Sequence, residues 1–177
     1  AAFTAGDPDA RQTSIDPDAA AIIAYTSGTT AEPKGCVHSH RSILAELRQL
    51  AAIQARDDLP SIVGAPVGHF IGMMAGLLLP MVLGRPIHLA DSWSPDAILA
   101  AMVEGDLTAG SGATYFLTSL LEHPRFGPEH RARMRYVGLG GAPVPAAVAD
   151  RAGELGISII RSFGCSEHPS ITGASHA

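Results

Sequence analysis

The sequence predicts an α/β fold in which strands and helices alternate around a largely parallel sheet. Short apolar runs alternate with longer segments of helical periodicity along most of the chain. Turns rich in glycine, proline and serine separate these segments. Alternation of this kind is typical of parallel strands joined by right-handed helical crossovers. Of the 177 residues, 46% are apolar and 16% are charged, which provides a core and excludes a disordered chain.

Six apolar runs are short enough to be strands and end at turn residues. They are predicted at residues 19–25, 61–67, 86–90, 107–111, 136–139 and 158–163. The first run is expected to be a buried strand that leads into a turn-rich loop. The preceding residues 1–18 are polar and rich in Asp and Pro, so we expect them to form an extended lead-in.

Five helices are predicted between these strands. Ser39 is a plausible N-cap for a helix to about residue 53, whose apolar side chains recur on one face. Residues 70–83 are apolar nearly all round, which indicates a buried helix. Ser94-Pro95-Asp96 marks the start of a helix that ends near Gly105. The remaining helices are expected at 114–122 and 146–155, with a charged loop at 123–133.

The charge pattern argues against several classes of partner. Twelve basic and seventeen acidic residues give a net charge of −5 without a basic run, so we expect neither nucleic acid nor an anionic membrane surface. The longest apolar stretch, residues 70–84, contains Pro80 and is shorter than the ~20 residues of a membrane span. Two cysteines and a polar start without a signal-peptide core predict a reducing, cytoplasmic setting.

The densest polar run lies between residues 25 and 35. Small hydroxyls and backbone N–H groups can surround phosphate oxygens, and a lysine adds a point charge. Pro33 precedes the lysine where a P-loop requires glycine, so this is a different kind of loop. Composition alone leaves an ordinary surface turn and an anion site both open. The residues of interest are Thr26, Ser27, Gly28, Thr29, Thr30, Lys34 and Gly35.

The order of residues in this run resembles the phosphate-loop signature of the adenylate-forming superfamily. That superfamily includes acyl-CoA synthetases, luciferases and peptide-synthetase adenylation domains. Ala31 stands where glycine is usual, which limits positive φ at that position. The resemblance implies that the β- and γ-phosphates of ATP bind to Thr26, Ser27, Thr29, Thr30 and Lys34.

Three downstream segments resemble further motifs of the superfamily, in the same order. Pro66-Val67-Gly68-His69 is similar to a segment whose histidine borders the acyl pocket, although His69 could also cap the next helix or bond to a buried carbonyl. Residues 138–143 resemble the glycine-rich loop beside adenine, or a simple helix-start turn. Residues 162–167 resemble a Tyr-Gly-x-Thr-Glu segment, with Phe163 and Ser166 in place of its tyrosine and threonine.

The resemblance implies a role for each of these positions. Adenine would be held by Gly140, Gly141, Ala142, Pro143, Phe163, Gly164 and Cys165, with Ser166 at the α-phosphate. Glu167 would bind Mg²⁺, and Lys34, Thr30, Glu167 and His69 would act in catalysis. The acyl pocket would be lined by Val67, His69, Met73, Gly110, Ser111, Gly112 and Gly138. The glycines in that set suggest room for a bulky acid.

The implied activity is an acid–thiol ligase. ATP and Mg²⁺ would activate a fatty, alicyclic or aryl acid to an acyl-adenylate with release of pyrophosphate, and coenzyme A would then form the thioester. The segment around His69 contains no carboxylate for an amino-acid ammonium group, which disfavours a peptide-synthetase domain. Three alternatives remain: a non-catalytic nucleotide-binding module, suggested by Ala31 and Phe163, an adenylation domain with another acceptor, and an unrelated α/β domain.

Residues 19–177 are expected to form part of an AMP-binding domain. A full superfamily member also carries a ribose-binding aspartate, a hinge and a C-terminal domain with a catalytic lysine. We therefore expect a fragment with little full-cycle activity that can self-associate through exposed apolar surface. His38 and His40 suggest either a metal site or a loop and helix cap. Cys36 and Cys165 are expected to be reactive thiols or small packed side chains.

Overall fold

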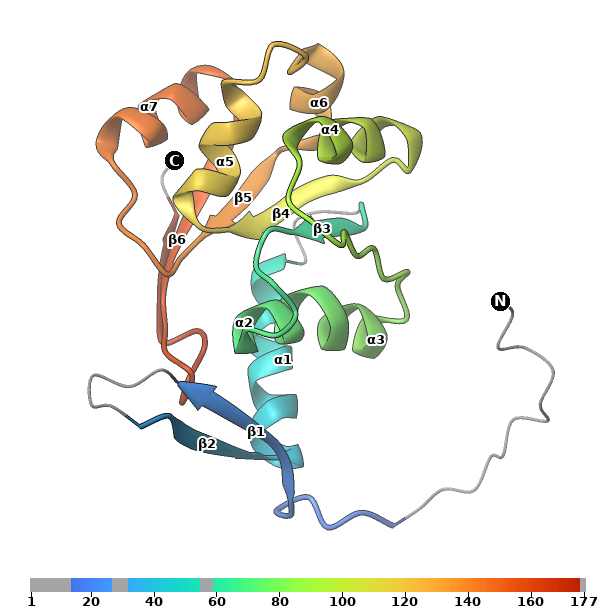
Figure 1. The fold of residues 1–177 in the computed structure, drawn as a ribbon, viewed down its shortest axis with the longest axis vertical. Helices are drawn as coiled ribbons and strands as arrows, with labels where there is room; N and C mark the ends of the chain where they lie inside the picture. Colours follow the sequence, from blue (N-terminus) through green and yellow to red (C-terminus); the bar gives the residue numbers. More distant parts are fainter. Residues whose placement is uncertain (1–13, 27–31, 55–58, 176–177) are drawn as a thin grey trace, which may run out of the picture.

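The computed structural model describes residues 14–26, 32–54 and 59–175. Its centre is a five-stranded sheet in the order β3-β4-β5-β6-β7 (Figure 1). Strands β3 to β6 run parallel and β7 is antiparallel to β6, which confirms the predicted mostly parallel α/β fold. The strands are β3 (Ser61–Val63), β4 (Thr108–Gly112), β5 (Tyr136–Leu139), β6 (Ser158–Phe163) and β7 (Thr172–Ser175).

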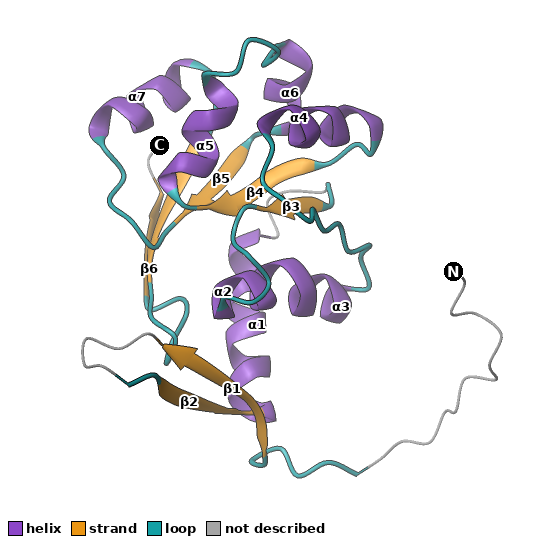
Figure 2. Cartoon of the chain, in the orientation of Figure 1, coloured by secondary structure: helices purple, strands orange, loops and turns teal. Residues whose placement is uncertain are grey.

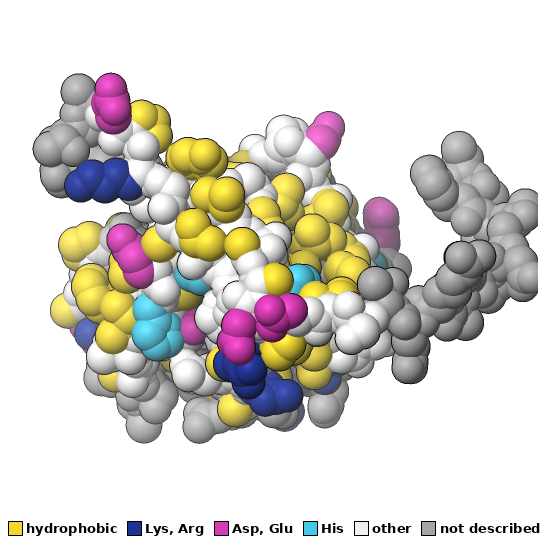
Figure 3. Space-filling model, turned by 90° about the horizontal axis from the view of Figure 1, so that it is seen from below, with side chains coloured by type: hydrophobic (Ala, Val, Ile, Leu, Met, Phe, Trp, Pro, Cys, Tyr) yellow, Lys and Arg dark blue, Asp and Glu magenta, His cyan; other side chains and the backbone are white. Residues whose placement is uncertain are grey.

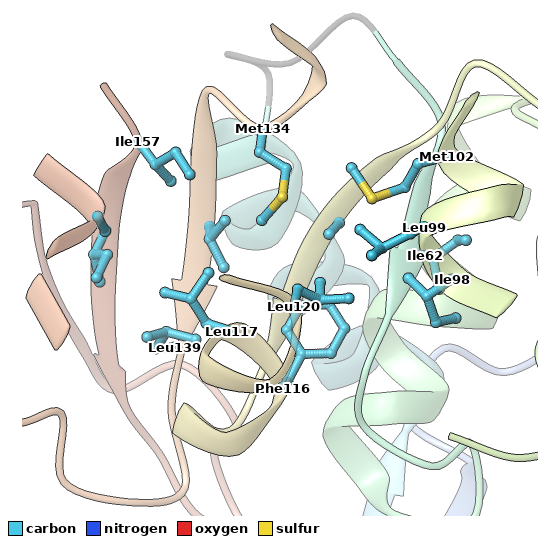
Figure 4. Packing of buried hydrophobic residues seen from close by; sticks show 14 of the residues in the cluster. Ile62, Ile98, Leu99, Met102, Phe116, Leu117, Leu120, Met134, Leu139 and Ile157 are labelled. Carbon is cyan, nitrogen blue, oxygen red and sulfur yellow. The ribbon is translucent and has the colours of Figure 1, made fainter. Parts of the chain in front are cut away.

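Four helices cover one face of this sheet (Figure 2). They are α4 (Pro95–Glu104), α5 (Thr114–Leu121), α6 (Pro128–Arg133) and α7 (Ala146–Glu154). Side chains from the helices and from alternate strand residues form the larger core cluster, in which Leu99, Met102, Leu117 and Leu120 have no exposed surface (Figure 4). Burying each such side chain stabilises the fold by about 1.5–3 kcal/mol. The cluster therefore holds the four helices against one face of the sheet.

The first part of the chain forms a separate layer on the other side of the sheet (Figure 1). Its elements are β1 (Ala20–Thr26), β2 (Lys34–Ser39), α1 (His40–Gln54), α2 (Phe70–Met73), the π-helical turn η1 (Met74–Leu78) and α3 (Leu79–Leu83). A second core cluster joins α1 to the helical run from α2 to α3. Ser39 accepts a hydrogen bond from the Ser42 backbone N–H at 3.2 Å, as predicted for the N-cap of α1.

Residues 19–25 are predicted to form a buried strand. They do form most of a strand, but the prediction that it is buried is wrong. The run forms β1, which pairs antiparallel with β2 in a two-stranded hairpin outside the main sheet. Ile22 and Ala24 pack against the second core cluster, while Ile23 and Tyr25 on the opposite face are 54% and 72% exposed. Figure 3 views the molecule from this side and shows hydrophobic side chains at its surface. A hairpin has two faces and only one of them is covered.

Three further predictions differ from the structure. Residues 86–90 form no strand, since Pro86 has no N–H for a ladder and none of the described strands pairs with them. The expected loop at 123–133 contains α6, which begins with Pro128 and whose entry is fixed by the Gly127 N–H bonding to His130 Nδ1 at 3.0 Å. Strand β7 was not predicted because it has no large apolar side chain.

The predicted helix at residues 70–83 is present as one continuous helical run with a π-helical turn at its centre. Pro80 follows directly after that turn, has no N–H to donate to the preceding turn and crowds it, which favours a locally widened helix. The last turn, Met81 to Leu83, is exposed, so only part of the helix is buried. None of the helices within the described ranges has the length and apolar character needed to cross a bilayer.

Candidate functional site

A cavity of about 690 Å³ lies on the sheet face opposite α4–α7, between the sheet and the layer containing α1 and α2. This volume is within the ~300–1,000 Å³ of small-molecule sites. The walls come from four parallel strands, from α1 and α2, and from the loop between β6 and β7. One end of the cavity therefore lies at the carboxyl ends of the strands, where open α/β sheets bind ligands.

Strand alternation explains why a cavity exists on this face. Successive strand residues point to opposite faces, and the core-facing positions carry Ile62, Ala109, Val137, Leu139 and Ile159. The intervening positions are mostly small or polar and leave space. They are Ser61, Val63, Thr108, Gly110, Gly112, Tyr136, Gly138, Ile160 and Ser162.

The glycines on this face also allow neighbouring strands to approach closely. A Cβ atom at Gly110 would lie 2.7 Å from the Ser61 Cβ, and one at Gly140 would lie 2.7 Å from the Ser162 Oγ. Both separations are shorter than real Cβ contacts. The bulky-acid interpretation of these glycines is therefore incomplete, because close packing against the neighbouring strand also favours glycine at both positions.

Most of the predicted site residues surround this one cavity. Its lining includes Thr26, His69, Gly110, Ser111, Gly112, Gly138, Gly140, Gly141, Gly164, Cys165, Ser166 and Glu167. Six other predicted residues, all described, do not line it: Lys34, Val67, Met73, Ala142, Pro143 and Phe163. Ser27, Gly28, Thr29 and Thr30 lie outside the described residues. His69 occupies the residue before α2 without a side-chain capping bond, so the capping interpretation of its imidazole is wrong.

The loop after β5 begins with two glycines, Gly140 and Gly141, that line the cavity. Gly141 has a φ of +75°, a conformation that glycine adopts without strain. The Thr114 hydroxyl donates to the carbonyl of Pro143 at 2.9 Å, which ties the end of this loop to the start of α5. Two consecutive glycines, Gly140 and Gly141, therefore form the part of this loop that lines the cavity.

Ser166 and Glu167 are the two central residues of a tight turn after β6. The Cys165 N–H donates to the His168 carbonyl at 3.0 Å, and the His168 N–H donates to the Cys165 carbonyl at 3.2 Å. A Cβ atom at Gly164 would overlap the Pro169 carbonyl oxygen, so the loop folds closely onto itself. Both central residues of the turn line the cavity.

Glu167 is exposed, and local donors hold its pKa below the ordinary value. Its own backbone N–H is the largest cause of the lowered pKa, followed by the side chain of Cys165. Burial opposes these two and is the third largest effect, and smaller effects of His38 and Lys34 lower the pKa further. The carboxylate is therefore ionised at neutral pH, which is the state that a hard cation binds.

His38 contacts this turn, although it belongs to none of the recognised motifs. Its Nε2 lies 2.7 Å from the carbonyl oxygen of Ser166, and its ring stacks on Phe70 with centroids 4.3 Å apart. The imidazole is buried in this contact. No group of three or more His, Cys, Asp or Glu suited to a metal occurs in the part of the chain that the structure describes, so a metal site built around His38 and His40 is not supported there.

Cys36 lies on the same face of β2 as His38. Burial raises the pKa of its thiol, and the charges of Glu167 and Cys165 raise it further. Its thiol therefore stays protonated at neutral pH, which favours the packed over the reactive interpretation. Both cysteines are free, and Cys165 is exposed.

Comparisons with known proteins agree with this arrangement. The sequence matches the AMP-binding enzyme family over residues 2–176. The medium-chain fatty-acid–CoA ligase of Escherichia coli (strain K12) is 33% identical over 154 residues, covering 85% of this chain and 27% of that protein. The 2-succinylbenzoate–CoA ligase of Bacillus subtilis (strain 168) is 29% identical over 155 residues, covering 85% of this chain and 30% of that protein.

A solved structure shows the same fold. The o-succinylbenzoate coenzyme A synthetase of Bacillus subtilis, in complex with ATP and a magnesium ion, matches with a TM-score of 0.78 at 26% identity, over 90% of this chain and 33% of that one. The chain thus spans about a third or less of the length of these relatives. With its family match over nearly all residues, the chain belongs to the AMP-binding enzyme family.

Proposed function

We propose that the protein containing this chain is an acid–thiol ligase that activates a carboxylic acid with ATP and transfers the acyl group to coenzyme A. One observation carries the proposal. A single cavity is lined by the Ser166–Glu167 turn and the Gly140–Gly141 loop, and also by a group of apolar residues beneath the sheet, Leu50, Val63, Phe70, Ile71 and Ala75. A nucleotide and an apolar acid bound there would meet at the carboxyl ends of the strands.

The nucleotide would bind at the end formed by the loops. Adenine would lie along Gly140, Gly141, Gly164 and Cys165, which line the cavity, and Ser166 would contact the α-phosphate. Ala142, Pro143 and Phe163 do not line the cavity and would contact adenine only from outside that lining. The β- and γ-phosphates would be bound by Thr26, Ser27, Thr29, Thr30 and Lys34. The position of Lys34 supports its part in this assignment, because it lies on the same strand, β2, as His38, whose Nε2 lies 2.7 Å from the Ser166 carbonyl oxygen.

Glu167 would hold Mg²⁺. Mg²⁺ prefers oxygen ligands and is usually bound through one or two carboxylates together with substrate phosphates. A single ionised carboxylate with no protein-only metal cluster around it, among the described residues, fits that mode. When bound, the ion would neutralise phosphate charge during the attack of an anionic acid.

The acid would occupy the apolar part of the cavity. Leu50, Val63, Phe70, Ile71 and Ala75 line it, which suits a fatty, alicyclic or aryl chain. His69 lies at the entrance of α2 and would border the carboxyl end of the acid. No carboxylate apart from Glu167 lines the cavity among the described residues, which gives an amino-acid ammonium group no second partner.

The proposed reaction has two displacement steps. A carboxylate oxygen attacks the α-phosphorus of ATP, and the bond to pyrophosphate breaks to leave an acyl-adenylate. The sulfur of coenzyme A then attacks the acyl carbon, AMP departs and the thiol proton is released. Two anions meet in the first step, so catalysis depends on positioning and charge neutralisation.

ATP–pyrophosphate exchange tests this proposal. The complete gene product is assayed with octanoate and with benzoate, beside the variants Lys34→Ala and Glu167→Gln. We expect acid-dependent exchange that both variants reduce by about 100-fold or more, the usual effect of removing a charge-stabilising group. Arg48→Ala and Glu104→Gln change exposed charges away from the cavity and serve as matched controls. Binding of Mg·ATP without any acid-dependent exchange would instead favour a non-catalytic nucleotide-binding module.

A further inference from the structure

Glu46 is an acidic side chain buried on the apolar face of α1. It is only 6% exposed and lies one helical turn from Ile43 and Leu50, which are also buried. Removing a carboxylate from water is costly unless hydrogen-bond partners replace the lost solvation. The identity of its partners therefore indicates why an acid occupies this position.

Both carboxylate oxygens of Glu46 bind the loop that follows Glu167. The Nδ1 of His168 lies 2.9 Å from Oε2, and the Ser170 hydroxyl donates to Oε1. His168 is also the last residue of the turn that contains Ser166 and Glu167, because its backbone exchanges hydrogen bonds with Cys165. Holding the His168 side chain thus holds one end of the turn.

The opposite side of the turn is held from β2. His38 contacts the Ser166 carbonyl oxygen at 2.7 Å and is itself fixed by stacking on Phe70. Strand β2 runs directly into α1. One continuous segment therefore carries Lys34 at its start and two anchors of the Glu167 turn farther along.

We propose that Glu46 is a positioning residue for the nucleotide site, and that its buried carboxylate fixes the Ser166–Glu167 turn through His168 and Ser170 so that Glu167 can bind Mg·ATP. This inference rests on the proposed function. Glu46 itself does not line the cavity, so it acts through the turn and not by touching the nucleotide.

Calorimetric titration of the complete gene product with Mg·ATP tests this role. We expect Glu46→Ala to weaken binding by about 10- to 100-fold, the range found when a residue that supports a metal ligand is removed. Glu46→Gln retains the shape and one acceptor, so its expected loss is about 5-fold, as for replacing a charged hydrogen bond by a neutral one. Glu104→Ala removes an exposed acid from α4 and should bind as the wild type does.

Introducing Glu46→Ala into the Glu167→Gln variant distinguishes a positioning role of Glu46 from a general loss of stability. If Glu46 acts through Glu167, then Glu46→Ala should add less than about 3-fold to the loss already caused by Glu167→Gln, because the two changes are coupled. A purely structural role would give the same additional loss in both backgrounds. That additive result would overturn the proposal.

Hydrogen exchange without any ligand gives a readout independent of activity. Glu46→Gln should accelerate amide exchange in residues 164–171 and leave β4 unchanged, and Glu46→Ala should do so more strongly. Unchanged exchange in that loop, or Mg·ATP binding equal to the wild type, would overturn the role of Glu46 alone. A wild-type protein that binds no Mg·ATP would overturn the proposed function as well.

Discussion

Replacing Gly110 by alanine tests the packing of β3 against β4. The new Cβ would lie 2.7 Å from the Cβ of Ser61 on the neighbouring strand, closer than atoms can approach without a shift. Overpacking of this kind costs about 1–3 kcal/mol, and the lower entropy of the unfolded chain offsets about 0.4–1 kcal/mol of that. We therefore expect Gly110→Ala to lower the free energy of unfolding by about 1–2 kcal/mol.

The matched experiment removes the obstructing side chain. In Gly110→Ala with Ser61→Gly the new methyl occupies the space of the serine, so the destabilisation should be largely recovered. Urea unfolding of the chain, followed by the fluorescence of its single tryptophan, Trp93, measures each free energy, because Trp93 packs against the large core cluster. Gly153→Ala in α7, where a Cβ meets nothing within 4 Å, should instead stabilise. Effects of the two changes at Gly110 and Ser61 that add within about 0.5 kcal/mol would refute the reasoning.

Three other predictions follow from individual contacts. Burial and nearby negative charge raise the pKa of Cys36, so its alkylation by iodoacetamide should require a higher pH than that of an ordinary thiol. Glu167→Gln removes one of these charges and should shift the pH dependence of alkylation to lower pH. An unchanged pH dependence would contradict the influence of Glu167 on Cys36. Leu99→Ala should lower the free energy of unfolding by about 2–5 kcal/mol, because Leu99 is fully buried. Leu44 is half-exposed, so Leu44→Ala should lower it far less. Equal losses in urea unfolding would be inconsistent with the core described. Ser94 accepts a hydrogen bond from the Ala97 backbone N–H, so Ser94→Ala should lower the unfolding free energy by about 0.5–2 kcal/mol, and faster exchange of the first amides of α4 checks the cause.

The sequence was sufficient to predict the parallel sheet because each central strand and helix has its own local signal. Apolar runs of four to six residues and capping serines act over short distances, and they placed β4, β5, β6, α1 and α4 within one or two residues. The prediction of a buried strand at residues 19–25 is wrong because an apolar run indicates only that at least one face of a strand is buried. It does not indicate the sheet to which the strand belongs. Its pairing partner β2 was hidden in a stretch that reads as a loop.

The sequence motifs predicted many of the residues that line the cavity. They did not predict the contacts of His38 and Glu46 with the loop after β6. His38 meets Ser166 across 128 residues, and Glu46 meets Ser170 across 124. Such pairings depend on how the hairpin layer docks onto the sheet, which no local pattern encodes. A signal for Glu46 was present, since an acid lay on the otherwise apolar face of a predicted helix.

A crystal structure of the complete gene product with octanoyl sulfamoyl-adenosine, a stable analogue of an acyl-adenylate, tests the central claim most directly. We predict that adenosine lies beside Gly140 and Gly141, that the sulfamoyl group lies at the Ser166–Glu167 turn, and that the octanoyl chain fills the cavity beneath the sheet. Density for the analogue outside this cavity, or with the acyl chain directed away from α2, would contradict the account.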